Sequence, residues 1–410
     1  MCEILENTNK ELCLDKSKWK LTKFGDVAIQ QKGKVDRENT NLTRYIKGEH
    51  MGSKDLHIRK WGDLTDEYLG PAFIRKFEKG DILYGSRRTY LRKVAIADFD
   101  GITSNTTFVI KANETKIDKR LLPFIMMSEG FTENSIKNSK GSVNPYINWK
   151  DIAKYEFLLP PKDQQAKLAE LLWAMDEVVE RDILALNKIE ATLNSNIENE
   201  IHGISLKGKV IREVLDEFSK KSELVPLVEL GELLKGKGIP KADVKTQGLP
   251  CVRYGELYTK HHRVIRNFNS FISEEVKAKS FLLKKNDILF AGSGETITEI
   301  GKSAAFIDDI EAYAGSDTLL FRPYDMDGYY LGYLMNSQFV RQQLNKYGTG
   351  ATVMHIYNSD LAKVKVPKID KEDQVKIAEK LEKISNNVFS LEEKISRSKA
   401  LQKSLINQVF

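Results

Sequence analysis

The sequence has few cysteines and no long apolar run. Of its 410 residues only Cys2, Cys13 and Cys251 are cysteines, and no two of them form a CxxC pair. A small, odd number of scattered cysteines indicates a reducing compartment and argues against a disulfide framework or a zinc knuckle. No apolar stretch approaches the roughly 18 residues of a membrane span, and residues 1–18 lack the basic and apolar parts of a secretory signal. These absences predict a cytoplasmic protein that binds no membrane.

Neither sign of charge dominates the chain. It has 64 basic and 58 acidic residues, a formal net charge of +6, which alone does not establish a nucleic-acid partner. A hydrophobic content of 41% with 30% charged residues is typical of a folded protein. The length leaves room for two or more domains, each with its own core.

Complete catalytic motifs are also missing. Asn144-Pro145-Tyr146 resembles the core of an adenine methyltransferase motif but lacks its second proline, and no glycine-rich cofactor loop precedes it. Gly294 and Gly301-Lys302 are separated by six residues, whereas a phosphate-binding loop has four at that place. The six histidines form no helix-spaced pair with a carboxylate, so no metal site is expected. The sequence therefore predicts a protein that is not an enzyme.

What the sequence does contain is a repeat. Lys79-Gly80-Asp81-Ile82-Leu83 returns 206 positions later as Lys285-Asn286-Asp287-Ile288-Leu289. Phe24-Gly25-Asp26 returns at the same offset as Leu230-Gly231-Glu232, and Gln165 to Glu170 returns at an offset of 209 as Gln374 to Glu379. This period is far above the 20 to 50 residues of solenoid repeats. Each copy is therefore a whole domain with its own tail, and two related domains are expected to recognise two related things.

The first part of each copy predicts short strands and helices. Residues 94–97, 108–110 and 318–321 have the β-branched and aromatic content of strands. Helices are predicted at 121–128 and 329–344, and one helical turn is predicted at 210–218 in the linker between the copies. Each part ends in a strand-like run closed by proline, at 155–161 and at 364–367.

The tail of each copy has a heptad pattern. From Gln164 to Ile201 there is no proline or glycine, and apolar residues recur every three to four positions. Repeated apolar a and d positions with flanking charges predict a coiled coil, and such a helix would be about 57 Å long. The polar d positions Asp182 and Asn196 either fix the register or are exposed. The predicted pairing residues are Leu172, Met175, Val179, Leu186, Ile189 and Leu193 with Leu381, Ile384, Val388, Leu391 and Ile395.

The predicted fold is α+β: two tandem pseudo-symmetric domains separated by two long helices paired as an antiparallel coiled coil. The alternative is that each long helix packs only on the surface of its own domain. The predicted segments are an N-terminal segment 1–18, a first domain 19–161, a central spacer helix 162–202, a linker 203–224, a second domain 225–367 and a C-terminal spacer helix 368–410.

Basic residues gather in two places that we interpret as equivalent in the two copies. One is 75–93, with interleaved tyrosines, and the other is 253–266, followed by a hydroxyl-rich loop at 293–298. Arginine and short polar side chains suit base edges, and lysines suit phosphates, although a solvated basic surface would give the same pattern. His261-His262 is expected to be a polar loop tip or a phosphate contact. The candidate DNA-binding residues are Arg75, Lys79, Arg87, Arg88, Tyr90, Arg92, Lys93, Arg253, Tyr254, His261, His262, Arg263, Ser293, Thr296 and Lys302. Of these, Arg87, Arg88, Tyr90, Arg253, Ser293 and Thr296 are expected at base edges.

Taken together, the repeated motifs and the heptad tails resemble the specificity subunit of type I restriction-modification systems. The resemblance extends over about residues 19–410. The family phrase IPPLxEQxxIA is similar to Leu159-Pro160-Pro161-Lys162-Asp163-Gln164-Gln165 with Leu168-Ala169, and GDILI…GxxGKxA to Asp287-Ile288-Leu289 through Gly301-Lys302-Ser303-Ala304. The first copy departs from the second phrase, because it has Arg88 and Arg92 in place of glycines. The resemblance therefore does not determine the conformation of this loop or its DNA contacts.

The resemblance implies a non-catalytic DNA reader with two target-recognition domains. Each would read one half of an asymmetric, bipartite site, and the helices would set the gap. Its partners would be double-stranded DNA, two methyltransferase subunits and the restriction subunits of the full complex. S-adenosylmethionine and ATP would belong to those partners, so no cofactor is expected on this chain. The alternatives are a coiled-coil scaffold without DNA specificity, a self-sufficient methyltransferase, and the recognition subunit of a modification-only system.

Overall fold

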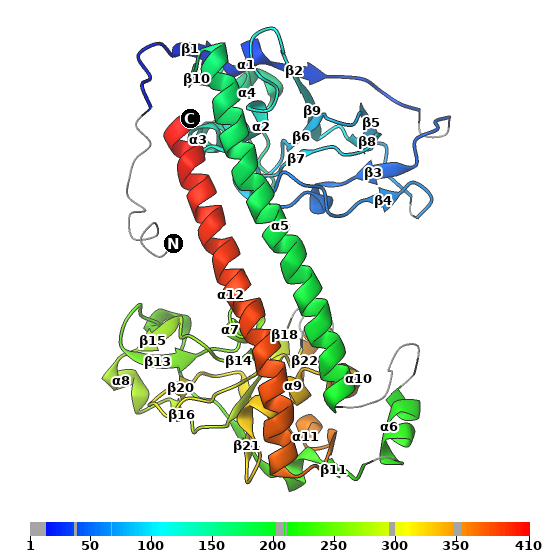
Figure 1. The fold of residues 1–410 in the computed structure, drawn as a ribbon, viewed down its shortest axis with the longest axis vertical. Coiled ribbons are helices and arrows are strands. Elements are labelled where there is room, and N and C mark those ends of the chain that lie inside the picture. Colours follow the sequence, from blue (N-terminus) through cyan, green and yellow to red (C-terminus); the bar gives the residue numbers. More distant parts are fainter. Residues whose placement is uncertain are drawn as a thin grey trace. The chain divides into compact units, whose positions relative to one another are not determined.

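A computed structural model describes residues 14–36, 39–66, 68–201, 209, 211–220, 222–294, 300–347 and 354–410. Cys2, Cys13 and Thr296 lie outside the described residues. The chain divides into two units, one made of Met1–Ile183 with Glu393–Phe410 and the other of Leu184–Glu392. Each unit is a mixed α and β domain that includes a segment of both long helices (Figure 1).

Unit 1 is built on two four-stranded sheets and a strand pair that leads into the first long helix. Its short helices are α1 (Phe24–Val27), η1 (Gly48–His50), η2 (Thr89–Leu91), α2 (Leu122–Met127), α3 (Glu129–Lys137) and α4 (Trp149–Ile152). Its first sheet has the strand order β2 (Ala28–Gln31), β9 (Thr107–Ala112), β6 (Ile82–Gly85), β7 (Val94–Ile96). The second sheet has the order β4 (Gly62–Asp63), β3 (Arg44–Ile46), β8 (Gly101–Ser104), β5 (Phe73–Phe77). The strand pair is β1 (Lys20–Lys23) with β10 (Glu156–Leu159).

Unit 2 repeats this plan with one added edge strand and one added strand pair. Its first sheet has the order β12 (Gly231–Lys235), β21 (Thr318–Pro323), β17 (Ile288–Ala291), β19 (Ser303–Ala305), β14 (Arg263–Val264). The second sheet has the order β15 (Ser270–Ile272), β13 (Leu249–Val252), β20 (Tyr313–Ala314), β16 (Phe281–Leu282). The pairs are β11 (Leu224–Pro226) with β23 (Lys365–Pro367), and β18 (Ser293–Gly294) with β22 (Met354–His355). The helices are α6 (Ile211–Ser219), η3 (Leu227–Glu229), η4 (Lys241–Asp243), α7 (Glu256–Thr259), α8 (Glu274–Lys277), α9 (Gly328–Met335), α10 (Gln338–Tyr347) and α11 (Asn358–Leu361).

The repeated Asp-Ile-Leu motif is the start of the central strand in each unit. Ile82 and Tyr84 contribute to one hydrophobic core and Leu83 to another, because successive side chains of a strand point to opposite faces. Ile288 and Leu289 divide in the same way in unit 2. Burial on both faces explains why the motif is an unbroken apolar run.

The turn before this strand explains the rest of the motif. Gly80 has φ 91° and Asn286 has φ 73°, a left-handed conformation that glycine and asparagine adopt at low cost. The next residue, Asp81 or Asp287, accepts a hydrogen bond at 2.8 Å from the backbone N–H at the start of the turn. The repeat at this point is therefore a requirement of backbone geometry.

The predicted alignment of the first residues is wrong by three positions. Lys23 pairs with Glu156 and Pro226 pairs with Lys365, so Phe24 is equivalent to Leu227 and not to Leu230. Phe24 begins a helix of four residues, whereas Leu227 begins a 3-10 turn of three residues. The shared glycine is thus a coincidence of sequence.

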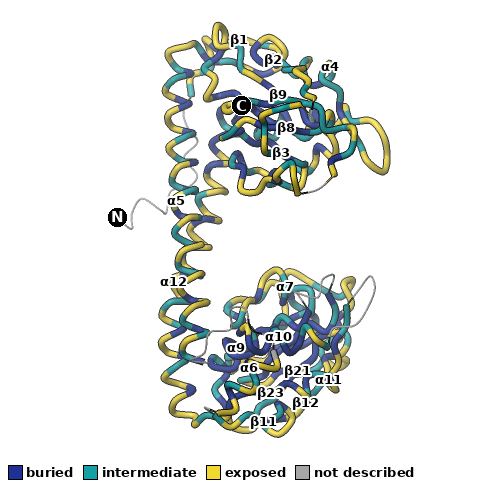
Figure 2. The backbone as a smooth tube through the Cα atoms, turned by 90° about the vertical axis from the view of Figure 1, so that its right-hand side faces the viewer, coloured by how far each residue is buried: buried dark blue, intermediate teal, exposed yellow. Residues whose placement is uncertain are grey.

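The predicted strands at 94–97, 108–110 and 318–321 and the helix at 121–128 are confirmed as β7, β9, β21 and α2. The helix predicted at 329–344 is two helices, largely buried (Figure 2). Asn336 ends α9 and its amide donates to the Ser303 carbonyl at 2.8 Å, while Ser337 accepts from the Val340 N–H and begins α10. The predicted turn at 210–218 is the helix α6, on which Phe218 stacks against Phe339 at 4.8 Å.

The long helices are α5 (Lys162–Ile201) and α12 (Lys371–Val409). In unit 1 they run antiparallel, since Asp176 accepts from Gln402 at 3.0 Å and Asp182 from Lys394 at 2.9 Å. In unit 2 Glu200 accepts from Lys380 at 3.0 Å. The a-position residues buried along the seam are Leu172, Val179, Leu193, Leu381, Val388 and Ile395, and Met175, Leu186, Ile189, Ile384 and Leu391 are half-buried.

The helices also pack on the domains. Leu172 of α5 and Leu405 of α12 belong to the core of unit 1, and Leu193 and Leu381 to that of unit 2. Of the two polar d positions, Asp182 bonds across the seam, whereas Asn196 donates to the Thr192 carbonyl of its own helix. Within the described ranges, no helix has the length and apolarity needed to cross a membrane.

Candidate nucleic-acid interface

In unit 1 the chain beyond β6 pairs with a distant loop to form a short antiparallel ribbon. Arg87 lies opposite Tyr146, the Arg88 N–H donates to the Pro145 carbonyl at 2.7 Å, and the Ile147 N–H donates to the Ser86 carbonyl at 2.9 Å. Ile147 is 1% exposed and fixes one end of the ribbon in the core. We call the segments 86–88 and 145–147 the first ribbon.

Unit 2 forms the same ribbon beyond β17. Ser293 pairs with His355 and Gly294 with Met354, and the Ile356 N–H donates to the Gly292 carbonyl at 3.1 Å. Ile356 is buried as Ile147 is. We call the segments 292–294 and 354–356 the second ribbon. The offsets are those of the repeat, so Arg87 is equivalent to Ser293 and Tyr146 to His355.

The loop that follows the first ribbon keeps the conformation that glycine would have. Arg88 has φ 49° and Arg92 has φ 51°, and Gly301, which occupies the place of Arg92 three residues before the matched alanines of β7 and β19, has φ 69°. A left-handed arginine costs about 1 kcal/mol or more. Arg92 thus replaces a glycine without a change of backbone, whereas Arg88 is left-handed at a place where unit 2 has Gly294 in the strand β18.

The first ribbon presents basic and aromatic side chains to solvent. Arg87, Arg88 and Lys140 are exposed, and Tyr90 and Tyr146 are 52% and 42% exposed. Thr89 Oγ1 and Ser139 Oγ lie 3.1 Å apart, which joins the two loops. Guanidinium forks and tyrosine rings are suited to base edges and stacked bases.

The second ribbon presents a different set. Ser293 Oγ lies 2.9 Å from His355 Nδ1, and the His355 ring stacks on that of Tyr357, which is 57% exposed. Tyr258 of α7 donates to the Ser293 carbonyl, and the Lys302 ammonium lies 5.9 Å from its ring. Arg253 and Tyr254 lie between β13 and α7, shortly before the helix whose Tyr258 contacts this ribbon.

The sequence did not single out Tyr146, His355, Tyr357 or Lys140 as DNA contacts. Tyr146 was interpreted only as part of an incomplete methyltransferase motif, and His355 as one of six scattered histidines. The signal that could have found them is the pair Tyr146-Ile147 and His355-Ile356, which recurs at the offset of 209. Each has an exposed or half-exposed polar residue before a buried isoleucine.

Three of the predicted DNA contacts are used within the protein. Arg92 makes a two-pronged ion pair with Glu129 of α3, which also holds the pKa of that carboxyl at about 2. Arg263 is largely buried and donates to Asn194 of α5 at 2.7 Å. His261 is 3% exposed, and burial lowers its pKa to about 4, so it is neutral and unsuited to a phosphate. These contacts leave Arg92, Arg263 and His261 less available to DNA than the exposed residues of the predicted set.

The other predicted residues are spread over the domains. Arg75 of β5 donates to the Lys32 carbonyl at 2.7 Å, and Lys93 to the Gly48 carbonyl at 2.5 Å. Lys79 is exposed at the end of β6 opposite to the first ribbon. His262 is exposed next to β14.

The two basic segments are not equivalent, contrary to the sequence interpretation. Arg75 pairs with Thr103 on β8, where unit 2 places Phe281 opposite Ala314. Arg253 follows β13, whose counterpart β3 is followed by Lys47. What the copies share is the ribbon, and not the basic stretches. No group of three or more histidine, cysteine or acidic residues able to hold a metal occurs in the described part of the chain.

This arrangement defines a class of protein: two recognition domains of one fold, each with its own ribbon, carried on paired long helices. The chain belongs to the type I restriction modification DNA specificity domain family, whose model matches residues 16–191 and again residues 219–398.

Relatives are found over almost the whole chain. It is 21% identical over 407 residues to the specificity subunit of the type I restriction enzyme MjaVIII from Methanocaldococcus jannaschii, covering 95% of this chain and 91% of that protein. It is 28% identical over 208 residues to the EcoDI specificity subunit from Escherichia coli, covering 49% of this chain and 44% of that one. Among solved structures, the S subunit of a type I restriction-modification system from M. genitalium has the same fold, with a TM-score of 0.58 at 13% identity and 98% of each chain covered.

Proposed function

We propose that this chain is the DNA-recognition subunit of a type I restriction-modification complex and carries out no catalysis itself. Its membership of the specificity-domain family supports DNA recognition. The observation that carries the proposal is the ribbon that occurs in both domains with different side chains. Arg87 and Tyr146 in one domain and Ser293 and His355 in the other occupy equivalent places.

The proposed target is a bipartite, asymmetric DNA site with one half for each domain. Two copies of one scaffold hold their ribbons in the same way, so a difference between half-sites must come from the side chains on the ribbons. Exposed lysines and arginines around them would contact phosphates, and this part of the affinity would fall steeply with salt. The two long helices would set the gap between the halves.

The partners in this proposal are two methyltransferase subunits and, in the full complex, restriction subunits. S-adenosylmethionine and ATP would be bound by those partners. Since the substrate is chromosomal or incoming DNA, the chain would act in the cytoplasm.

The test is to map methylated bases in DNA treated with the assembled methyltransferase complex. We expect one bipartite site with a fixed gap. The double variant R87A/Y146A should change or relax one half, and S293A/H355A the other half, with about 1 to 3 kcal/mol of discrimination lost for each good base contact. Lys116→Ala is the matched control, because Lys116 is exposed on the same domain beyond the end of β9 that lies away from the first ribbon.

A chain that binds random duplex as well as the mapped site at physiological salt would be a scaffold without specificity, and the proposal would be wrong. A complex that methylates the site but recruits no restriction subunit would belong to a modification-only system.

A further inference from the structure

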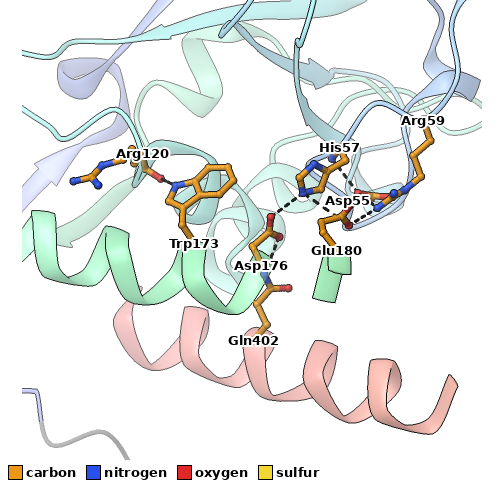
Figure 3. Close-up of polar contacts among 8 residues, drawn as sticks. All are labelled: Asp55, His57, Arg59, Arg120, Trp173, Asp176, Glu180 and Gln402. Carbon is orange, nitrogen blue, oxygen red and sulfur yellow. Dashed lines mark hydrogen bonds and ion pairs between the residues drawn. The ribbon is translucent and has the colours of Figure 1, made fainter. Parts of the chain in front are cut away.

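Each recognition domain directs one arginine onto the long helix that follows it in the sequence. In unit 1 the Arg59 Nε donates to Asp55 at 2.7 Å and its Nη2 to Glu180 of α5 at 2.5 Å (Figure 3). In unit 2 the Arg266 Nη2 lies 3.0 Å from both carboxylate oxygens of Glu382 on α12, and its Nη1 donates to Asn386 at 2.9 Å.

These two arginines occupy the same place in the fold. His57 pairs in parallel with Ile96, as Val264 pairs with Ala305. Ile96 and Ala305 in turn lie opposite the first isoleucine of the repeated Asp-Ile-Leu motif. His57 is therefore equivalent to Val264, and the two residues that follow, Ile58-Arg59, are equivalent to Ile265-Arg266. Both isoleucines are buried, at 8% and 0% exposed, so each arginine leaves a fixed point of the domain.

A second contact of each domain with its helix lies at the start of that helix. The Gln165 side chain accepts from the Asp118 N–H at 2.7 Å and donates to the Pro160 carbonyl at 2.8 Å. The Gln374 side chain accepts from the Asp327 N–H at 2.9 Å and donates to the Ile369 carbonyl at 3.0 Å. At 1.5 Å per residue, Glu180 lies about 22 Å along α5 from Gln165, and Asn386 about 18 Å along α12 from Gln374.

Besides the apolar packing of each helix on its domain, two polar attachments that far apart along the helix define the angle between the helix and the domain. Arginine suits this role because its planar fork holds a defined geometry against carboxylate and amide oxygens. Arg59 is partly exposed, so solvent screens its ion pair and the pair adds little to stability.

We propose that Arg59 and Arg266 are positioning residues that hold each recognition domain at a fixed angle on its helix, and so determine how strictly the protein measures the gap between the two DNA half-sites. This inference rests on the proposed function. The helices can define a gap only to the extent that the domains cannot turn on them, since a turn of the domain moves its ribbon.

In unit 1 the contact extends to both helices. His57 Nε2 lies 2.7 Å from Asp176 of α5, and the other oxygen of Asp176 accepts from Gln402 of α12 (Figure 3). In unit 2 the Glu382 carboxylate also accepts from Tyr333 of α9, and the Arg266 guanidinium lies 5.7 Å from the Phe389 ring. Both arginines thus form an ion pair with their helix, and the surrounding contacts differ: His57 with Asp176 in unit 1, and Tyr333 and Phe389 in unit 2.

The experiment uses the assembled methyltransferase complex and duplexes that carry its mapped half-sites with the gap lengthened or shortened by one base pair. R59Q and R266Q are each expected to reduce the preference for the correct gap about tenfold, with both half-site sequences unchanged. R59K and R266K keep the charge without the fork and should fall between. E180Q and E382Q remove the same ion pairs from the helix side and should reproduce the effect.

K60Q and K260Q are the controls, since each removes one exposed positive charge close to the arginine in sequence. If R59Q and R266Q keep the wild-type gap preference while half-site recognition is intact, the positioning role is overturned and the proposed function stands. If the wild-type complex shows no preference for any gapped site, the proposed function fails and this inference fails with it.

Discussion

Arg88 shows how a single residue can combine backbone cost with an exposed side chain. Its left-handed backbone disfavours any residue with a Cβ. We expect Arg88→Gly to raise the free energy of unfolding by about 0.5–1 kcal/mol while weakening recognition of one half-site. Urea denaturation and binding to the mapped site would measure the two effects.

Lys54→Gly is the matched control for this prediction. Lys54 is exposed in the same domain and has φ 56°, so the backbone relief is similar. It should gain stability and keep its DNA preference. Equal loss of DNA binding in both variants would show that the backbone, and not the Arg88 side chain, matters.

His57 makes the stability of unit 1 depend on pH. The hydrogen bond to Asp176 raises its pKa above the ordinary value, aided by the charges of Glu180 and Asp55, while burial opposes this. The pKa is therefore higher in the folded than in the unfolded state. The stabilisation is fully present below the unfolded pKa of about 6.5 and is lost as the pH rises through the folded pKa.

We expect the wild type to exceed H57Q in free energy of unfolding by about 0.5–1 kcal/mol near pH 5.5, and the excess to be lost as the pH rises through the folded pKa of His57. Denaturant unfolding at several pH values would measure it. A difference that grew with rising pH would contradict the sign of the shift.

At the scale of elements, the glutamine at the start of each long helix joins that helix to its domain. Gln165 and Gln374 are 2% and 3% exposed, and each bonds one backbone N–H and one carbonyl. Alanine at either position would leave both backbone groups without this partner. We therefore expect Q165A and Q374A each to lower the free energy of unfolding by about 1–3 kcal/mol.

Thermal and denaturant unfolding would measure this loss, with K167A as the control because Lys167 is exposed two residues further along α5. A cost for Q165A no larger than that of K167A would show that water replaces the glutamine at no penalty.

The sequence predicts elements well where the pattern is local and less well where pairing is distant. The central strands and the heptad helices follow from apolar periodicity within one segment. The ribbons do not, because Arg87 pairs with Tyr146, 59 residues later, and Ser293 pairs with His355, 62 residues later. The same holds for Arg59, whose partner Glu180 is on another element.

Predictions of charge had a similar limit. A count of basic residues cannot separate an exposed Arg87 from an Arg263 that donates to Asn194, or from an Arg92 that pairs with Glu129. Those differences depend on side-chain burial and on partners from other segments. The repeat itself was the better guide, once the strand register had aligned it.

At the scale of the whole molecule, the two ribbons belong to different units and share no side chains. The free-energy changes caused by substitutions at distant sites without shared partners are usually additive. We expect the loss of binding energy in the variant Y146A/H355A to equal the sum of the losses in Y146A and H355A to within about 0.5 kcal/mol. Titration of the mapped duplex with the three variants would measure it, and a clear departure from the sum would show that the half-sites are read cooperatively.

Unit 1 takes its core from both ends of the described chain. Leu405, Ile406 and Val409 pack with residues such as Phe124 and Phe157, which are separated from them by all of unit 2. When about the first 200 residues have emerged from the ribosome, α12 has not yet been synthesised. The apolar surface of unit 1 that α12 covers is therefore still exposed. Contacts so distant in sequence form late. The domain synthesised first is thus the one completed last, and a nascent chain must be protected until synthesis has passed its final helix.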